Sequence, residues 1–151
     1  MSKENSTKRT LKDLLEHWGL KSLKINAMFL EATFEPSPED QEAAWEMYIE
    51  LITRVSTQHL LPDHGYEITA LESIHSLFEI TRNILKNKGR KSEKFTQIAV
   101  IILNQIIRPF TSEWHKKASE EGFNKKNAKL FRRSLESLQI ELRNYTRLLS
   151  D

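Results

Sequence analysis

A heptad repeat of apolar residues in the last quarter of the sequence constrains the fold more than any other feature. Its members are separated alternately by three and four positions, and they are Ala128, Phe131, Leu135, Leu138, Leu142, Tyr145 and Leu149. This spacing places all of these side chains on one face of an α-helix, and such a face is stable only when it packs against other helices. The repeat therefore predicts a helical bundle.

The preceding residues predict three more long helices and a short one. Ser37 followed by Pro38 and several acidic residues is typical of a helix N-terminus, and glycine is typical of a helix end. The expected helices are residues 38–59, 66–87 (ended by Gly89), 92–107 and the short helix 111–121 (ended by Gly122).

The segment 92–107 is apolar on nearly all sides, so we expect it to be the most buried helix, with a buried strand as the alternative. Asn104 and Gln105 interrupt it, and we expect one of them to face the core. Pro109 should end or kink this helix and should favour an extended backbone at Arg108.

The N-terminal part is expected to add a smaller appendage to the bundle. Residues 1–9 are polar and predict a disordered tail, and a short helix should span Thr10 to His17. Residues 22–34 alternate partly like a strand but have no visible partner strand, so we expect an extended arm lying on the bundle. The predicted fold class is all-α, an antiparallel bundle of four main helices with residues 10–151 in one domain.

Several function classes are excluded by composition. The 151 residues include no cysteine, which excludes disulfides, thiolate zinc sites and a cysteine nucleophile. No stretch of 18 residues is free of charge, so no membrane-spanning helix is expected. The N-terminus lacks the apolar core of a signal peptide, and we therefore expect a cytoplasmic protein.

The net charge of +2 conceals a strong asymmetry along the chain. Residues 31–79 hold eleven acidic residues and one basic residue, a balance of −10, whereas residues 82–133 hold fourteen basic and four acidic residues, a balance of +10. Such a division concerns electrostatic fields and partners rather than the fold.

The acidic half has carboxylates at helical spacing. Four of them, together with Arg54, should form one stripe: Glu39, Glu42, Glu46 and Glu50. Carboxylate-bridged metal sites in bundles need paired Glu-x-x-His motifs, and only Glu72–His75 matches. The spacing of His59, His64 and His75 fits no zinc motif. Since Gly-rich phosphate loops and hydrolase motifs are also missing, we expect a solvated stripe and neither a metal nor a cofactor.

The basic half and two tryptophans are candidate binding surfaces. The basic candidates are Lys116, Lys117, Lys125, Lys126, Arg132 and Arg133. Lysine and arginine suffice for contacts to nucleic-acid phosphates, but they could equally complement the acidic half, within one chain or between copies. Trp45 and Trp114 are expected to be exposed and to contribute to protein contacts.

The run Arg108-Pro-Phe-Thr-Ser-Glu-Trp-His115, in an all-helical chain of this length, resembles the motif of the HEPN ribonucleases. The resemblance implies that Arg108 and His115 act at an RNA phosphate, with His115 moving a proton and Arg108 stabilising developing charge. It also implies a dimer in which two such pairs meet around RNA. The alternative is structural: Arg108 pairs with acidic residues of the other half and Trp114 is an anchor.

A second resemblance covers about residues 35–118. The runs 43–58, 70–82 and 103–115 are similar to an uncharacterised bacterial helical family whose members occur near predicted defence genes. Two functions therefore stay open. The first is a non-enzymatic helical adaptor that assembles through charged protein contacts, with itself or with a partner protein. The second is a HEPN-like, metal-independent ribonuclease that uses Arg108 and His115.

Overall fold

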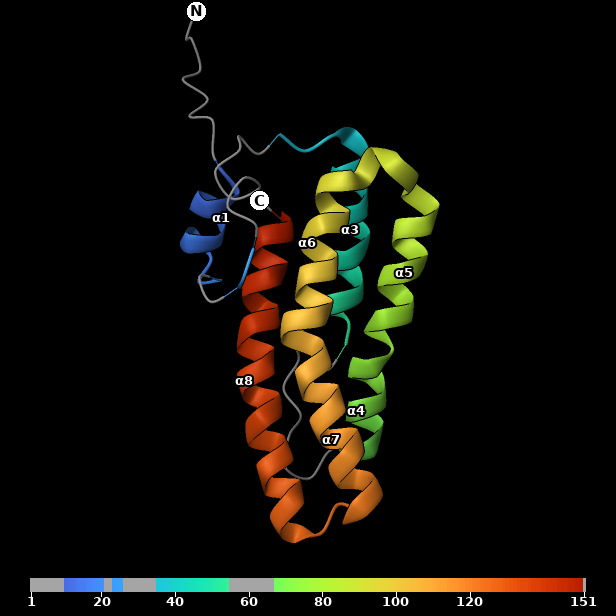
Figure 1. Ribbon diagram of the computed structural model, residues 1–151, viewed down its shortest axis with the longest axis vertical. Coiled ribbons are helices and arrows are strands. Elements are labelled where there is room, and N and C mark those ends of the chain that lie inside the picture. The colour runs from blue at the N-terminus through green and yellow to red at the C-terminus, as the bar shows by residue number, and fades with distance from the viewer. Residues whose placement is uncertain (1–9, 21–22, 26–34, 55–66, 151) are drawn as a thin grey trace, which may run out of the picture.

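The computed structural model of the protein describes residues 10–20, 23–25, 35–54 and 67–150. Throughout these residues the regular elements are helices and none is a strand, which confirms the all-α class. The long helices lie side by side along one axis as four rods that alternate in direction: α3, α4 with α5, α6 with α7, and α8 (Figure 1). None of the described helices combines the length and the apolarity that crossing a bilayer requires.

Helix α3 spans Pro38–Ile52 and begins at the residue expected from the sequence. Its N-cap Ser37 forms a reciprocal capping box with Asp40. The expected extension to His59 is wrong, because Thr53 is already the C-cap. The Thr53 hydroxyl donates to the carbonyl oxygen of Ile49 (2.8 Å) and competes with the continuing helix.

The predicted second helix is two helices in line, α4 (Glu67–His75) and α5 (Leu77–Lys88). They are separated at Ser76, whose hydroxyl donates to the carbonyl oxygen of Ser73 (2.6 Å). Gly89 ends α5 as expected, with a φ of 71° that favours glycine. A 3₁₀ turn, Gly89–Ser92, then leads into the next rod.

The third rod contradicts the predicted break at Pro109. Helix α6 (Glu93–Ile102) continues through a π-helical turn (Leu103–Ile107) directly into α7 (Arg108–Glu120). Arg108 is helical, with φ −59° and ψ −44°, rather than extended. In the π turn the Arg108 N–H donates to the carbonyl oxygen of Leu103, five residues earlier. This wider turn gives space to the proline ring, which would clash with a carbonyl in a regular helix.

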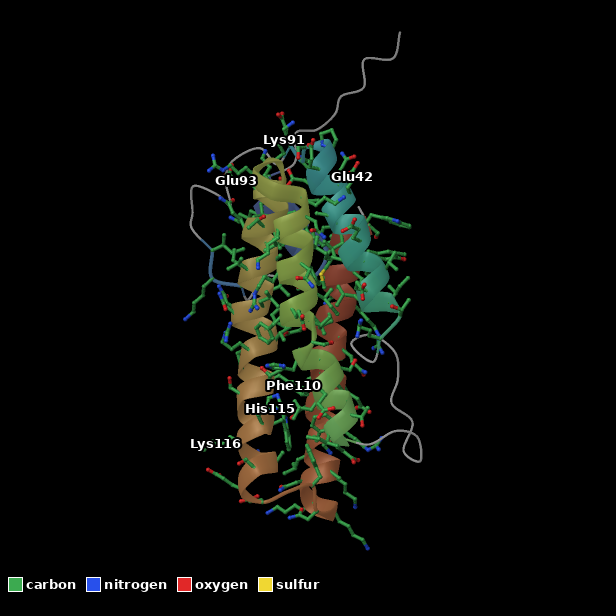
Figure 2. All side chains as sticks on the ribbon, turned by 90° about the vertical axis from the view of Figure 1, so that its right-hand side faces the viewer. Glu42, Lys91, Glu93, Phe110, His115 and Lys116 are labelled. Atoms are coloured by element: carbon green, nitrogen blue, oxygen red, sulfur yellow. The ribbon has the colours of Figure 1, made fainter. Side chains whose placement is uncertain are left out.

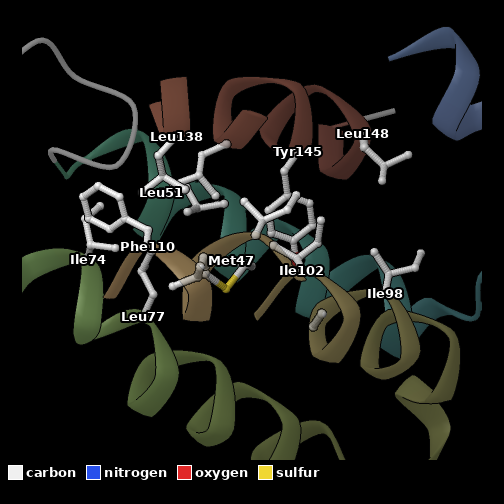
Figure 3. Close-up of a cluster of buried hydrophobic side chains, with 14 of the residues drawn as sticks. Met47, Leu51, Ile74, Leu77, Ile98, Ile102, Phe110, Leu138, Tyr145 and Leu148 are labelled. Carbon is white, nitrogen blue, oxygen red and sulfur yellow. The ribbon is translucent and has the colours of Figure 1, made fainter. Parts of the chain in front are cut away.

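The core lies between the four rods and contains side chains from each of them (Figure 3). Helix α8 (Lys125–Ser150) supplies the predicted seam, and Phe131, Leu135, Leu138, Leu142 and Tyr145 are buried. At the two ends the buried positions are Asn127 and Leu148 rather than the predicted Ala128 and Leu149, which are only partly buried. The heptad pattern is therefore correct over the middle of α8 and is one residue off at each end.

The expectation that α6 and the following turn are the most buried segment is only partly right. Val100 on α6 is exposed, and so are Asn104 and Gln105, neither of which faces the core. Gln105 instead holds the chain segment 23–25. Its amide accepts from the Lys24 N–H (2.7 Å) and donates to the Lys24 carbonyl oxygen (2.6 Å).

The short N-terminal helix α1 spans Leu11–His17, as predicted, with Thr10 as N-cap. Residues 23–25 are irregular and pack on the bundle, which agrees with the predicted arm over those three positions. The rest of the predicted arm and the tail 1–9 lie outside the described residues.

Candidate functional site

An open cleft of about 370 Å³ lies where α4, α5 and α7 meet. Its lining is polar and aromatic and consists of His75, Phe78, Arg82, Arg108, Thr111, Ser112 and His115. Arg108 and His115 are seven residues apart on α7, which is close to two helical turns, so both side chains lie on the same face. Figure 2 shows His115 on α7 in the space between α7 and α4.

The π turn determines which face of α7 borders the cleft. A π turn adds one residue to a helical turn, which rotates all later side chains by about 100° relative to an uninterrupted α-helix. With this rotation Phe110 and Trp114 point into the core, whereas Arg108 and His115 line the cleft. The irregularity at Pro109 therefore positions the two residues of the predicted motif.

The Arg108 side chain is held by two contacts. Its Nε donates to Oδ1 of Asn104, one turn earlier, at 3.1 Å. Its guanidinium carbon lies 4.8 Å from the centre of the Phe78 ring on α5, a cation–π geometry. These contacts direct the guanidinium toward α5 and fix it in the cleft.

The opposite wall of the cleft brings a second histidine to the first. The His75 and His115 rings meet edge to face, with their centroids 5.1 Å apart. His75 also packs against Phe78, at 5.6 Å between ring centroids. Both histidines are exposed, so a ligand in solution can reach their ring nitrogens.

The electrostatic character of the cleft is cationic. Arg82 and Arg108 carry permanent positive charges, the two histidines can each accept a proton, and the Ser112 hydroxyl can donate a hydrogen bond. The Thr111 hydroxyl already donates to the Arg108 carbonyl oxygen, at 3.1 Å. None of the described residues that line it is acidic. Such a set of donors is suited to a phosphate group, which arginine binds in bidentate fashion.

The structure thus brings Arg108 and His115 together, but it changes the expected setting of Arg108. The predicted helix break at Pro109 would have placed Arg108 at the start of a new helix, where free backbone N–H groups add to phosphate binding. Arg108 lies instead inside a continuous rod, so its side chain alone faces the ligand. Arg54 and His59 form another Arg–His pair in the sequence, with four intervening residues instead of six, but His59 lies outside the described residues.

Trp114 was predicted to be exposed, and this is wrong. Its side chain is 1% exposed and packs against Phe123 and Phe131. Its Nε1 has no hydrogen-bond partner among the described residues. The neighbouring Lys117 lies over the indole ring at 4.7 Å and also pairs with Glu113 at 3.1 Å. Trp45, in contrast, is 58% exposed, as expected.

Several members of the acidic stripe pair with basic residues of the same chain. Lys88 on α5 bridges Glu42 and Glu46 of α3 at 3.2 Å each, and these hydrogen bonds raise the pKa of Lys88 above its usual value. Glu50 pairs with Arg54 at 3.0 Å. The two halves of the chain therefore complement each other in part within one molecule.

The remaining basic candidates differ in their surroundings. Arg132 pairs with Glu67 of α4 at 3.0 Å, so it joins α8 to α4. Lys116, Lys125, Lys126 and Arg133 are exposed, and Glu39 is partly buried near the start of α3. In the part of the chain that the structure describes, no three histidine or acidic side chains are grouped to hold a metal ion. His59 and His64 lie outside that part.

Sequence reasoning missed Arg82 and the role of His75 in the cleft. Both lie far from the motif in sequence, and only the packing of α4 and α5 on α7 brings them to it. A usable signal was present in the sequence. His75 and Arg82 lie on adjoining helices and are seven residues apart, which is the same spacing as that of Arg108 and His115. No protein-family model, no curated protein and no solved structure matches this chain.

Proposed function

We propose that the protein is a ribonuclease that cleaves RNA without a metal ion, with Arg108 and His115 as catalytic residues. The observation that carries the proposal is that both side chains line one open, cationic cleft. A buried or separated pair could not act on one phosphate, whereas this pair can. The cleft offers arginine and histidine side chains rather than the carboxylates that hold catalytic magnesium, which favours acid–base chemistry.

The chemistry follows from these groups. The RNA 2′-oxygen attacks the adjacent phosphorus, and the non-bridging oxygens gain negative charge in the transition state. Arg108, fixed by Asn104 and Phe78, can stabilise that charge, and an imidazole nitrogen of His115 can move a proton at a reacting oxygen. The reaction requires a 2′-hydroxyl, so DNA is not a substrate.

The test compares wild type with His115→Ala and Arg108→Ala on structured RNA in the presence of a chelator. We expect cleavage by wild type, and losses of about 10²-fold or more in both variants. His17→Ala is a matched control, because His17 is an exposed histidine on α1. Absence of cleavage by wild type, or cleavage that survives His115→Ala, would refute the proposal.

A second function, assembly through protein contacts, is favoured by the surface of α3. Trp45 is exposed and stacks on Tyr48, with 5.4 Å between ring centroids, and Ile49 beside them is also exposed. Glu42 and Glu46 flank this surface and remain largely accessible beside Lys88. We propose a second copy of the chain as the occupant, with its exposed Lys125, Lys126 and Arg133 facing the acidic residues.

This contact joins different surfaces of the two copies, so it would produce open chains of subunits rather than closed pairs. The expected mass in solution falls as salt is added, because exposed charges are screened. Trp45→Ala should lower the mass at low salt, and Ile140→Ala, which removes an exposed apolar side chain from α8, is the control. A monomer at low salt would exclude self-assembly. Either activity is compatible with a role in bacterial defence, which we propose from the sequence resemblance alone.

A further inference from the structure

We infer that His75 is a second catalytic residue and that it works with His115 as an acid–base pair within one chain. The inference rests on the proposed ribonuclease function and extends it to residues outside the Arg108–His115 motif. It is carried by the contact between the two imidazole rings at the cleft, where the two arginines also converge.

RNA transesterification needs two proton transfers at one phosphate. The attacking 2′-oxygen loses a proton, and the departing 5′-oxygen gains one. These two oxygens lie on opposite sides of the phosphorus, because the displacement is in line. The Arg108–His115 motif supplies one histidine, so a single chain needs one more proton-transfer group or a second copy that brings it.

The cleft supplies that group from its other wall. His75 is the last residue of α4, and His115 lies on α7, so the two imidazoles come from opposing helices. Their centroids are 5.1 Å apart and their ring planes are nearly perpendicular, at 86°, so the two rings present different edges. A phosphate seated at the cleft mouth could therefore meet one ring at each of its two reacting oxygens.

Two arginines line the same cleft as the histidines. Arg108 lies on the His115 helix and Arg82 on α5, which continues from the His75 helix. Both line the cleft, and each can donate to the non-bridging oxygens while the histidines handle protons. His75 itself is placed by its packing on Phe78, the same ring that holds the Arg108 guanidinium.

The atoms balance without any additional reactant. The neutral histidine takes the proton of the 2′-hydroxyl as the new 2′-oxygen–phosphorus bond forms. The protonated histidine gives its proton to the 5′-oxygen as the phosphorus–5′-oxygen bond breaks. The products are a 2′,3′-cyclic phosphate and a free 5′-hydroxyl, and the two histidines end with their protonation states exchanged.

The experiment uses the full chain and two RNA substrates that differ at one atom. One substrate is ordinary, and in the other a sulfur replaces the bridging 5′-oxygen at the cleavage site. A thiolate departs without a proton, so the sulfur substrate does not need the general acid. Cleavage is measured for wild type, His75→Ala, His115→Ala and the control His17→Ala.

On ordinary RNA we expect His75→Ala and His115→Ala each to lose about 10²- to 10⁴-fold in rate. On the sulfur substrate one of these two variants, and only one, should recover to within about tenfold of wild type. That variant identifies the general acid. Binding of a 2′-deoxy analogue, which cannot react, should change less than about threefold in both variants, which separates catalysis from a structural role.

The outcomes separate the two proposals. If wild type cleaves RNA and His75→Ala cleaves it equally fast, or if the sulfur substrate rescues neither histidine variant, the role of His75 is refuted while the ribonuclease function stands. If wild type cleaves neither substrate, both proposals fail. Recovery of activity on mixing His75→Ala with His115→Ala would show a site shared between copies and would refute the single-chain arrangement.

Discussion

Asp40 on α3 and Phe95 on α6 are joined by a hydrogen bond in which the backbone N–H of Phe95 donates to the Asp40 Oδ1, at 2.9 Å. The other carboxylate oxygen accepts from the backbone N–H and the hydroxyl of Ser37, at 2.8 and 3.0 Å. One carboxylate, only 4% exposed, therefore caps the first turn of two helices. This arrangement fixes the start of α3 against the start of the rod that carries the candidate site.

Replacing Asp40 with alanine should destabilise the fold more than the replacement of a single polar residue usually does. The variant leaves the N–H of Phe95 and that of Ser37 without their acceptor, and it breaks the capping box. We expect a loss of about 2–4 kcal/mol in the free energy of unfolding. Urea titration followed by circular dichroism measures it. Glu39→Ala in the same helical turn should cost less than about 0.5 kcal/mol, and an equal cost in both variants would contradict this account.

Trp114 should tolerate replacement by phenylalanine better than its burial suggests. Its indole fills the core against Phe123 and Phe131, but its buried N–H has no partner among the described residues. Trp114→Phe loses packing and also removes an unsatisfied donor, so the expected net cost is below about 1.5 kcal/mol. Trp114→Ala should cost about 3–5 kcal/mol. Chemical denaturation measures both, and similar losses would contradict the prediction.

Tyr145 should make the stability of the fold vary with pH in the alkaline range. Complete burial raises the pKa of its hydroxyl above the ordinary value of 10.0. The unfolded chain therefore releases this proton at lower pH than the folded chain, so the stabilising contribution is complete below pH 10 and is lost as the pH rises through the folded pKa.

The Tyr145→Phe variant has no ionisable hydroxyl at this position. Above pH 10 its free energy of unfolding should therefore rise relative to that of wild type by about 1.4 kcal/mol per pH unit. Denaturant titrations at a series of alkaline pH values measure this difference. Tyr48→Phe reports the general effect of removing a tyrosine hydroxyl. If the curves for wild type and Tyr145→Phe stay parallel above pH 10, the burial of Tyr145 does not control its ionisation.

The fold could be predicted where local signals and packing agree. The capping sequence at Ser37, the glycine at position 89 and the seam of α8 each indicated their elements correctly, because each signal is contained in a short run of residues. The helix break predicted at Pro109 was wrong. A proline ordinarily ends a helix, and the π turn that accommodates this one leaves no pattern in the sequence. The early end of α3 at Thr53 also depends on one local hydrogen bond.

The candidate site was predictable only in its α7 half. The spacing of Arg108 and His115 places them on one face, but which face depends on the π turn. His75 and Arg82 come from other helices, and their approach is a consequence of tertiary packing. Trp114 was wrongly predicted to be exposed, because the rotation caused by the π turn determines which positions of α7 are buried.

Arg82 should contribute one ionic contact to RNA binding. It lines the cleft from α5 and carries a permanent charge, so a phosphate in the cleft would displace a counterion when it contacts Arg82. In a His115→Ala background, where RNA stays intact, Arg82→Gln should weaken binding and reduce the slope of log Kd against log salt concentration by about 0.7. Fluorescence anisotropy with a labelled single-stranded RNA measures the slope. Arg90→Gln is the matched control, because Arg90 is exposed on the turn after α5 and lies outside the cleft. Equal slopes for Arg82→Gln and Arg90→Gln would show that RNA does not enter the cleft.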